Sequence, residues 1–339
     1  MTPAIFGLSG PTLCDNERAF FRDCDPAGYI LFARNIETRE QLRALTDDLR
    51  SIHGRDKLLI SIDQEGGRVA RMKPPEWDAF PAGSAFAALY AIAPASAIEA
   101  ARSNAMMLAH DLAEVGISVD YLPLLDVRQE GASDVIGDRA LGSDPMQIAA
   151  LGRAILDGLA RGGVTGCVKH MPGHGRALVD SHKDLPVVDA ADEELKTDLA
   201  PFKALRDAPI GMSAHIRYTA WDTDNPATLS ATVIAKIIRQ RIGFDGLLLT
   251  DDLDMEALAG TVPQRASQAI AAGCDIALNC WAKMDDMVGI AKALPSLCDK
   301  GAQRLDAALM APQDAPDLPP REQMLEQRDG LLALEGEVA

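Results

Sequence analysis

The chain has 339 residues and a formal net charge of −17, from 33 lysines and arginines against 50 aspartates and glutamates. An acidic surface repels phosphate backbones and anionic lipid, so this charge argues against nucleic-acid and membrane partners. The N-terminus lacks a basic region, and no stretch approaches ~20 consecutive apolar residues. The six cysteines form no CxxC pair, which indicates free thiols in a reducing compartment. We therefore expect a cytoplasmic protein that acts as a monomer.

Short apolar runs alternate along the chain with longer amphipathic segments. The runs are nearly continuous in aliphatic residues, as is typical of strands buried on both faces of a parallel sheet. They are residues 4–10, 28–34, 58–64, 119–127, 166–172, 209–215, 246–252 and 275–280. In the amphipathic segments, apolar residues recur every three or four positions, which predicts helices. These segments are residues 38–52, 96–116, 146–161, 230–241, 263–272 and 283–293.

This alternation predicts an α/β fold, a single-domain (β/α)8 barrel of the TIM type. A doubly wound open sheet is the alternative, but the first strand is not followed by a Gly-rich dinucleotide-binding turn. The Pro-rich segment 72–95 is predicted to be a long loop over the barrel mouth. We expect residues 1–300 to form the catalytic barrel. Residues 301–339 are expected to form a linker and a short acidic helix, 321–337, that packs on its outside.

Polar side chains follow the ends of five predicted strands. One strand-end aspartate is more often a helix cap than a functional group. Five such ends together indicate a ligand-binding mouth, because a polar group after an aliphatic run loses solvation unless it is paired. These residues are Asp63, Asp126, Lys169, His170, His215, Asp251 and Asp252. Asp251 is expected to point into the mouth, whereas Asp254 and Glu256 are expected in the first turn of the next helix.

The segment "VKHMPGHGRALVDSHKD" (168–184) contains three of the six histidines of the chain. Gly173 and Gly175 predict a long, mobile loop that carries Asp180 and His182. A carboxylate beside an imidazole keeps one ring nitrogen protonated, so that the other nitrogen can exchange a proton near neutral pH. Three histidines and an aspartate could instead bind zinc, or the histidines could be structural. The residue types alone leave these three interpretations open.

The same segment resembles the K-H-[FM]-P-G-H-G-x(4)-D-x-H motif of the NagZ group of β-N-acetylglucosaminidases in glycoside hydrolase family 3. Four further blocks match that group in order. They are "IDQEGGRVAR" (62–71), "VIGDRALGSD" (135–144), "MSAHIRY" (212–218) and "GFDGLLLTDDLDMEAL" (243–258). The resemblance implies a retaining exo-enzyme without a metal or organic cofactor. It also implies the removal of terminal GlcNAc from muropeptides, including GlcNAc-1,6-anhydroMurNAc peptides, in peptidoglycan recycling.

The resemblance further implies roles for individual residues. Asp251 corresponds to the nucleophile, which forms a covalent glycosyl-aspartate. His182 corresponds to the general acid/base, and Asp180 orients it. The implied sugar-binding residues are Asp63, Arg71, Arg139, Lys169 and His170. Arg71 could contact the sugar or support Asp63, and we expect His174 to support its own loop.

Three other interpretations fit part of this pattern. A β-N-acetylglucosaminide phosphorylase would use the same nucleophile with phosphate in place of water, since a neutral histidine does not repel an anionic acceptor. A sugar-binding barrel without activity would not need an acid/base residue on a loop. A metal-dependent hydrolase would lose its activity when treated with a chelator. We therefore expect a β-N-acetylhexosaminidase and retain the phosphorylase as the alternative.

Overall fold

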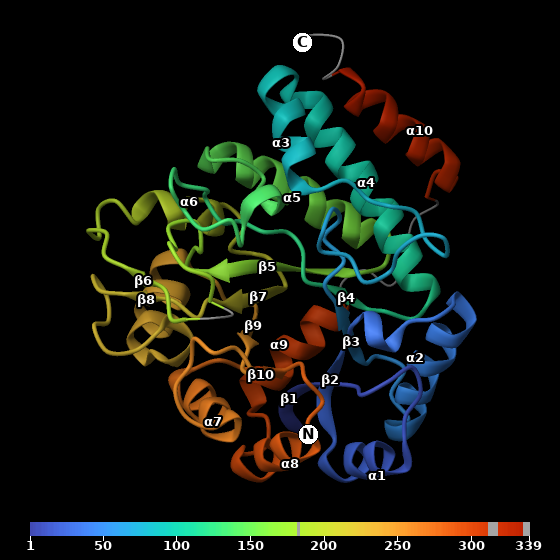
Figure 1. Ribbon diagram of the computed structural model, residues 1–339, viewed down its shortest axis with the longest axis vertical. Helices are drawn as coiled ribbons and strands as arrows, with labels where there is room; N and C mark the ends of the chain where they lie inside the picture. Colours follow the sequence, from blue (N-terminus) through green and yellow to red (C-terminus); the bar gives the residue numbers. More distant parts are fainter. Residues whose placement is uncertain (182–183, 311–317, 335–339) are drawn as a thin grey trace.

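The computed structural model describes residues 1–181, 184–310 and 318–334. Within these residues, strands close into a barrel in the order β1, β2, β3, β4, β5, β7, β9 and β10 (Figure 1). All neighbouring strands of the barrel are parallel. They are β1 (Thr2–Gly7), β2 (Pro26–Leu31), β3 (Leu59–Ile62), β4 (Val119–Asp120), β5 (Thr165–Met171), β7 (Ile210–Ser213), β9 (Leu247–Asp252) and β10 (Ile276–Asn279). Each lies largely within one predicted run, and the predicted TIM-type barrel is confirmed.

Two hydrophobic layers account for the aliphatic character of the strands. Side chains such as Ile5, Leu59 and Ile210 fill the barrel interior. Their neighbours on the strands, such as Phe6 and Ile60, face outward and pack with the surrounding helices. Because successive strand residues point to opposite faces, both layers require apolar residues, and the runs become continuous.

Helices surround the barrel in the described part of the chain. They are α1 (Asp15–Cys24), α2 (Arg39–His53), α3 (Gly83–Ile92), α4 (Pro94–Glu114), α5 (Pro145–Arg161), α6 (Lys196–Ala204), a π-helix (Val233–Ile242), α7 (Val262–Ala272), α8 (Met284–Ala293), α9 (Asp299–Met310) and α10 (Arg321–Leu332). All six predicted amphipathic segments contain a helix. The sequence analysis did not predict α1, α3, α6 or α9. A small parallel sheet of β6 (Val187–Val188) and β8 (Arg217–Tyr218) lies outside the barrel.

Helix ends follow local sequence signals. α2 begins after Thr38, whose side chain accepts a hydrogen bond from the Gln41 amide, and it ends at Gly54 in the left-handed conformation. α5 begins after Asp144, whose carboxylate accepts from the amides of Met146 and Gln147. Local side-chain caps thus define where both helices begin.

Segment 72–95 differs from the predicted long loop, because its second half is the helix α3, which packs on α4 (Figure 1). Its first half folds back toward the end of β3. The Phe80 carbonyl accepts from the Gly67 amide at 2.8 Å, and a Cβ atom on Gly66 would lie 2.2 Å from the Pro81 carbonyl oxygen. The first half of the segment therefore supports the loop after β3, and the second half is the helix α3 beside the barrel.

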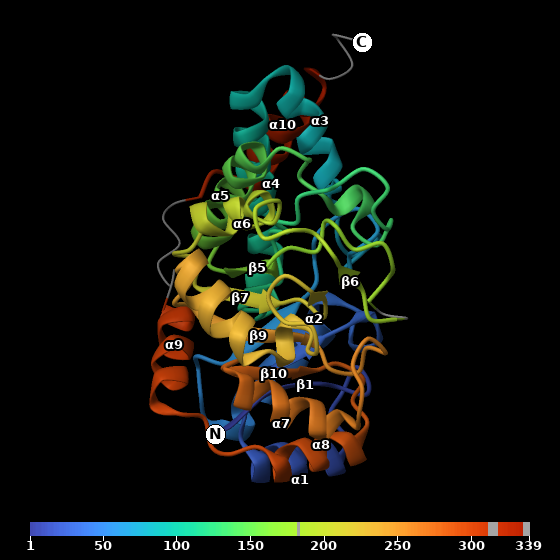
Figure 2. The same ribbon diagram turned by 90° about the vertical axis from the view of Figure 1, so that its left-hand side faces the viewer.

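The C-terminal helices occupy different places on the barrel (Figure 2). Leu305 and Ala308 of α9 belong to the same apolar cluster as the barrel interior, and Thr165 of β5 donates to the Ala308 carbonyl at 2.8 Å. α10 instead packs on α4, where the Arg321 guanidinium donates to both carboxylate oxygens of Asp111 at 3.0 and 2.9 Å. Among the described helices, none combines the length and the apolar character needed to cross a membrane.

Candidate active site

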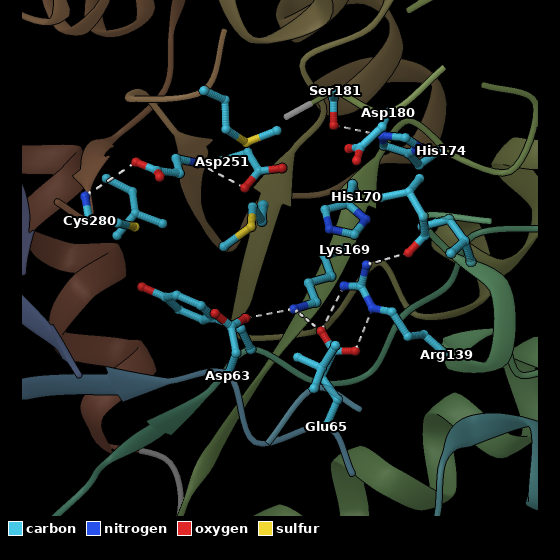
Figure 3. A pocket seen from close by; sticks show the side chains of 18 of the residues that line it. Asp63, Glu65, Arg139, Lys169, His170, His174, Asp180, Ser181, Asp251 and Cys280 are labelled. Atoms are coloured by element: carbon cyan, nitrogen blue, oxygen red, sulfur yellow. Dashed lines mark hydrogen bonds and ion pairs between the residues drawn. The ribbon is translucent and has the colours of Figure 1, made fainter. Parts of the chain in front are cut away.

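A cavity of about 730 Å³ opens where the barrel strands end at their C-termini. It is lined by residues from most of the strand ends and from the loops that follow them (Figure 3). The predicted site residues that line it are Asp63, Arg71, Arg139, Lys169, His170, Asp180 and Asp251. His182, the predicted acid/base, lies outside the described residues. The structure therefore brings together every predicted site residue that it describes.

Lys169 connects two carboxylates from the loop after β3. Its ammonium group lies 2.9 Å from Asp63 Oδ1 and 2.6 Å from Glu65 Oε1, and the side chain is only 2% exposed. The Arg139 guanidinium holds Glu65 from the other side with two hydrogen bonds, at 2.7 and 2.8 Å. Four charged groups from two loops and strand β5 thus form one continuous chain along the wall of the cavity (Figure 3).

The charges in this chain fix its protonation states. Burial alone would raise the pKa of Asp63, but the positive charges of Lys169 and Arg71 lower it below the usual value. Burial and the charges of Lys169 and Arg139 act in the same way on Glu65, with a net lowering of its pKa. The two carboxylates in turn raise the pKa of Lys169, against the effect of burial. All of these groups remain charged at neutral pH.

Arg71 contacts Asp63 and also lies against an aromatic ring. Its Nη2 atom is 3.3 Å from Asp63 Oδ2, and its guanidinium carbon is 5.2 Å from the centre of the Phe32 ring. The side chain therefore supports Asp63, which was one of the two predicted roles. Its contact with a sugar remains a prediction.

His170 is oriented by Asp126 in the loop after β4. His170 Nδ1 lies 2.8 Å from Asp126 Oδ2, and the main-chain amides of His170 and His174 donate to Asp126 Oδ1 at 3.2 and 2.6 Å. Burial would raise the pKa of Asp126, but the adjacent His170 and these hydrogen bonds lower it to about 2. With Nδ1 fixed on this carboxylate, Nε2 is the ring nitrogen left for contacts in the cavity.

Asp251 stands near the end of β9, and its carboxylate lines the cavity (Figure 3). Its Oδ1 atom accepts from the Asp252 amide at 2.8 Å. Burial would raise its pKa, but the charges of His170 and His215 together with this hydrogen bond lower it below the usual value. The group is therefore an ionised carboxylate at neutral pH, the state in which it can act as a nucleophile.

His215, also predicted at a strand end, is buried and has both ring nitrogens engaged. Nδ1 lies 2.8 Å from Thr228 Oγ1, and Nε2 lies 2.9 Å from the Asp252 carbonyl oxygen. The prediction that Asp254 and Glu256 lie in the first turn of the next helix is wrong, because α7 begins at Val262. Asp254 instead lies in the turn after β9. Its Oδ2 atom accepts from the Asn279 side chain at 2.6 Å and from the Cys280 amide at 3.2 Å, so that it joins the ends of β9 and β10.

The loop after β5 begins as a packed segment, although its glycines predicted mobility. A Cβ atom on Gly175 would lie 1.8 Å from the Val127 carbonyl oxygen, and the Ala177 carbonyl accepts from the Ser133 amide at 2.8 Å. His174 is buried, and its Nε2 atom lies 3.2 Å from Ser181 Oγ. His174 thus supports its own loop. Its partner Ser181 lines the cavity together with Asp180.

Two residues of the site, Glu65 and Asp126, have contacts that no sequence pattern predicts. Glu65 occurs in the block "DQEGGR" but was assigned no role, and Asp126 was identified at a strand end without a partner. Both act on residues distant in the sequence, Arg139 and His170, so no local signal reveals their contacts. In the described part of the chain, no group of three or more His, Cys, Asp and Glu side chains is arranged as a metal site. His182 lies outside the described residues.

Comparison with known proteins identifies the family. Residues 12–311 match the model described as "Glycosyl hydrolase family 3 N terminal domain". The chain belongs to glycosyl hydrolase family 3. A β-hexosaminidase from Bordetella avium is 38% identical over 317 residues, which cover 91% of this chain and 89% of the relative. A β-hexosaminidase from Alkalilimnicola ehrlichii is 40% identical over 285 residues, 82% of this chain and 80% of the relative.

A solved structure extends this family relationship to the whole fold. The crystal structure of NagZ from Neisseria gonorrhoeae in complex with N-trifluoroacetyl-D-glucosamine has a TM-score of 0.87 and 31% sequence identity, and the match covers 98% of each chain. The predicted resemblance to the NagZ group of family 3 is confirmed, and the protein is a glycoside hydrolase of the β-N-acetylhexosaminidase type.

Proposed function

We propose that this family 3 enzyme is a retaining exo-β-N-acetylglucosaminidase that removes non-reducing GlcNAc from muropeptides during peptidoglycan recycling. The substrates are GlcNAc-1,6-anhydroMurNAc and its peptides, and the enzyme acts on them as a cytoplasmic monomer. The observation that carries the proposal is the ionised Asp251 in one cavity with Asp180 and the charged chain from Asp63 to Arg139. The N-trifluoroacetyl-D-glucosamine bound by the Neisseria gonorrhoeae protein supports the choice of sugar.

The chemistry follows a double displacement. Asp251 attacks the anomeric carbon as the glycosidic bond breaks, and the departing oxygen takes a proton from His182. Neutral His182 then takes a proton from water, and the water oxygen displaces Asp251 from the sugar. The proposed role of Asp180 is to hold one nitrogen of the His182 imidazole, which leaves the other nitrogen for the leaving oxygen.

The charged chain in the cavity wall would bind the sugar hydroxyls. Asp63 accepts from hydroxyl groups and Lys169 donates to them. Three N–H groups of Arg139 already donate to Glu65 and Val135, and its remaining N–H groups reach the sugar. His170 contributes Nε2. Contacts already made in the ground state lower KM, whereas contacts that tighten as the ring approaches the transition state raise kcat.

Trapping with a 2-fluoro β-glycoside of the GlcNAc type tests the nucleophile. A 2-fluoro substituent slows hydrolysis of the glycosyl-enzyme, so that mass spectrometry of peptides should find the label on Asp251. Label on another residue would refute the assignment. A 2-fluoro sugar lacks the 2-acetamido group. If that group were the nucleophile, the probe would leave no covalent adduct, and the N-acetylated aryl glycoside would give an oxazoline product.

The acceptor and the natural substrate require a second experiment. Turnover of GlcNAc-1,6-anhydroMurNAc should release free GlcNAc at a rate that phosphate does not change. Formation of GlcNAc 1-phosphate in phosphate buffer would instead show a phosphorylase with the same nucleophile. Cleavage of an aryl glycoside without cleavage of the muropeptide would refute the proposed substrate and leave the enzyme class intact.

A further inference from the structure

Two arginines join the loop after β3 to the loop after β4 in opposite directions. Arg68 belongs to the first loop, and its Nη2 atom donates to the carbonyl oxygens of Asp134 and Val135 in the second, at 3.0 and 2.7 Å. Arg139 belongs to the second loop and binds Glu65 in the first with two hydrogen bonds. We refer to this arrangement of Arg68, Val135, Arg139 and Glu65 as the arginine clasp.

The two arginines share one acceptor. The Val135 carbonyl oxygen accepts from Arg68 at 2.7 Å and from Arg139 Nη1 at 3.1 Å. The Nε atom of Arg68 also donates to Asp138 Oδ1 at 2.8 Å. The position of the Arg139 guanidinium therefore depends on where Arg68 holds the Val135 carbonyl group.

The second loop has little regular structure of its own. Residues 130–144 contain only the short 3-10 turn Gly137–Arg139, and Gly137 has a φ of 48°. Carbonyl groups in such a segment need hydrogen-bond partners from elsewhere. Arg68 supplies them to consecutive residues that line the cavity, whereas an exposed ion pair such as that with Asp138 contributes little by itself.

We propose that Arg68 is a positioning residue, which holds the loop after β4 so that Arg139 remains on Glu65 and in reach of the sugar. The planar guanidinium is required, because an ammonium group cannot donate to two carbonyls and a carboxylate in one plane. Loss of this fork lets the loop move away and withdraws Arg139 from the wall that also contains Lys169 and Asp63. The inference rests on the sugar-binding role proposed above for Arg139.

The test compares Arg68→Lys with Arg128→Lys. Arg128 is a matched control, since it lies in the same loop and its side chain pairs with the exposed Asp134 at 3.9 Å. With an aryl β-GlcNAc substrate, Arg68→Lys should raise KM and the inhibition constant of GlcNAc about tenfold, equal to ~1.4 kcal/mol, and change kcat much less. Arg128→Lys and Asp138→Asn should leave both constants within about twofold. A KM for Arg68→Lys equal to that of the control overturns the proposal.

Two further measurements separate positioning from other roles. Amide hydrogen exchange of residues 134–139 should become faster in Arg68→Lys and stay unchanged in Arg128→Lys, and equal rates in the two variants overturn the proposal. In an Arg139→Lys background, Arg68→Lys should have little additional effect on GlcNAc binding. A full tenfold effect there would mean that Arg68 contacts the sugar independently. If the wild-type enzyme did not bind GlcNAc at all, the proposed function would fail, and the exchange rates would still decide whether the clasp exists.

Discussion

Lys169 is the residue on which the charge balance of the cavity depends. It is buried, and it compensates two carboxylates that are also shielded from water. A buried ion pair adds little to stability compared with apolar residues, but removal of one partner leaves an uncompensated charge. The residue thus has a structural effect in addition to its proposed contact with the sugar.

We expect Lys169→Met to lower the free energy of unfolding by about 3–5 kcal/mol. Urea denaturation monitored by circular dichroism measures this change. Lys236→Met, at an exposed position in the π-helix, serves as the control and should stay within about 0.5 kcal/mol of wild type. Equal stability of the two variants would show that Asp63 and Glu65 do not need this cation.

His174 makes stability depend on pH. Burial lowers its pKa to about 4, against about 6.5 in the unfolded chain. Between these values the unfolded chain binds the proton more readily, so stability is complete above about pH 6.5 and falls as the pH drops toward 4. The greatest loss from this group is about 3 kcal/mol.

His174→Gln should remove this part of the pH dependence. Free energies of unfolding from urea titrations between pH 4 and 7 should fall less steeply for the variant than for wild type. His110→Gln, which changes a half-exposed histidine on α4, serves as the control substitution. A His174→Gln variant with the wild-type slope would mean that other buried histidines, such as His215, account for the acid sensitivity.

At the scale of the elements, α9 closes the N-terminal end of the barrel. Leu305 and Ala308 complete the interior cluster, and Arg304 donates to Asp275 at 2.9 Å. The proposed division of the chain at residue 300 therefore falls inside a helix that contributes to the barrel core. α10 is the part of the extension that packs outside, on α4.

Leu305→Ala should lower the free energy of unfolding by about 2–5 kcal/mol, because it leaves a cavity at the closed end of the barrel. Asp306→Ala, at the next and exposed position of the same helix, should change it by less than about 0.5 kcal/mol. Chemical denaturation of both variants measures the difference. A small loss for Leu305→Ala would mean that α9 is an accessory helix and would favour the division at residue 300.

The elements that sequence could predict are those with a strong periodic pattern. Continuous aliphatic runs identified every strand of the barrel, since burial on both faces leaves no other option. α3 was missed because its sequence is apolar on all sides, and α6 because it contains Pro201. Polar strand ends and motifs identified the cavity residues. The contacts of Glu65 and Asp126 span 74 and 44 positions and follow only from the folded barrel.

For the whole molecule, the interior of the barrel determines the shape of the cavity. Ile30, Tyr121, Met212 and Leu278 line the cavity and also belong to the interior cluster. Below them the barrel is filled with side chains, as in other barrels of this type. The cavity is therefore closed at its lower end in the described part of the chain, which supports the proposed action on a terminal sugar.

Free GlcNAc should inhibit hydrolysis of an aryl glycoside competitively, because it occupies the closed end of the cavity. A saccharide whose non-reducing sugar is blocked at O4 by a bulky group should not be hydrolysed. Steady-state kinetics and product chromatography measure both effects. Release of internal fragments from the blocked saccharide would show that the cavity is open to chains, and noncompetitive inhibition would place GlcNAc elsewhere.

The seal that α9 makes beneath the barrel also determines the order of events in each catalytic cycle. Under the proposed mechanism, substrate, water and both products share the opening at the C-terminal ends of the strands. The aglycone would then leave before water reached the proposed glycosyl-Asp251, and the sugar, bound deepest, would leave last. The rate of turnover would then be limited by the dissociation of GlcNAc.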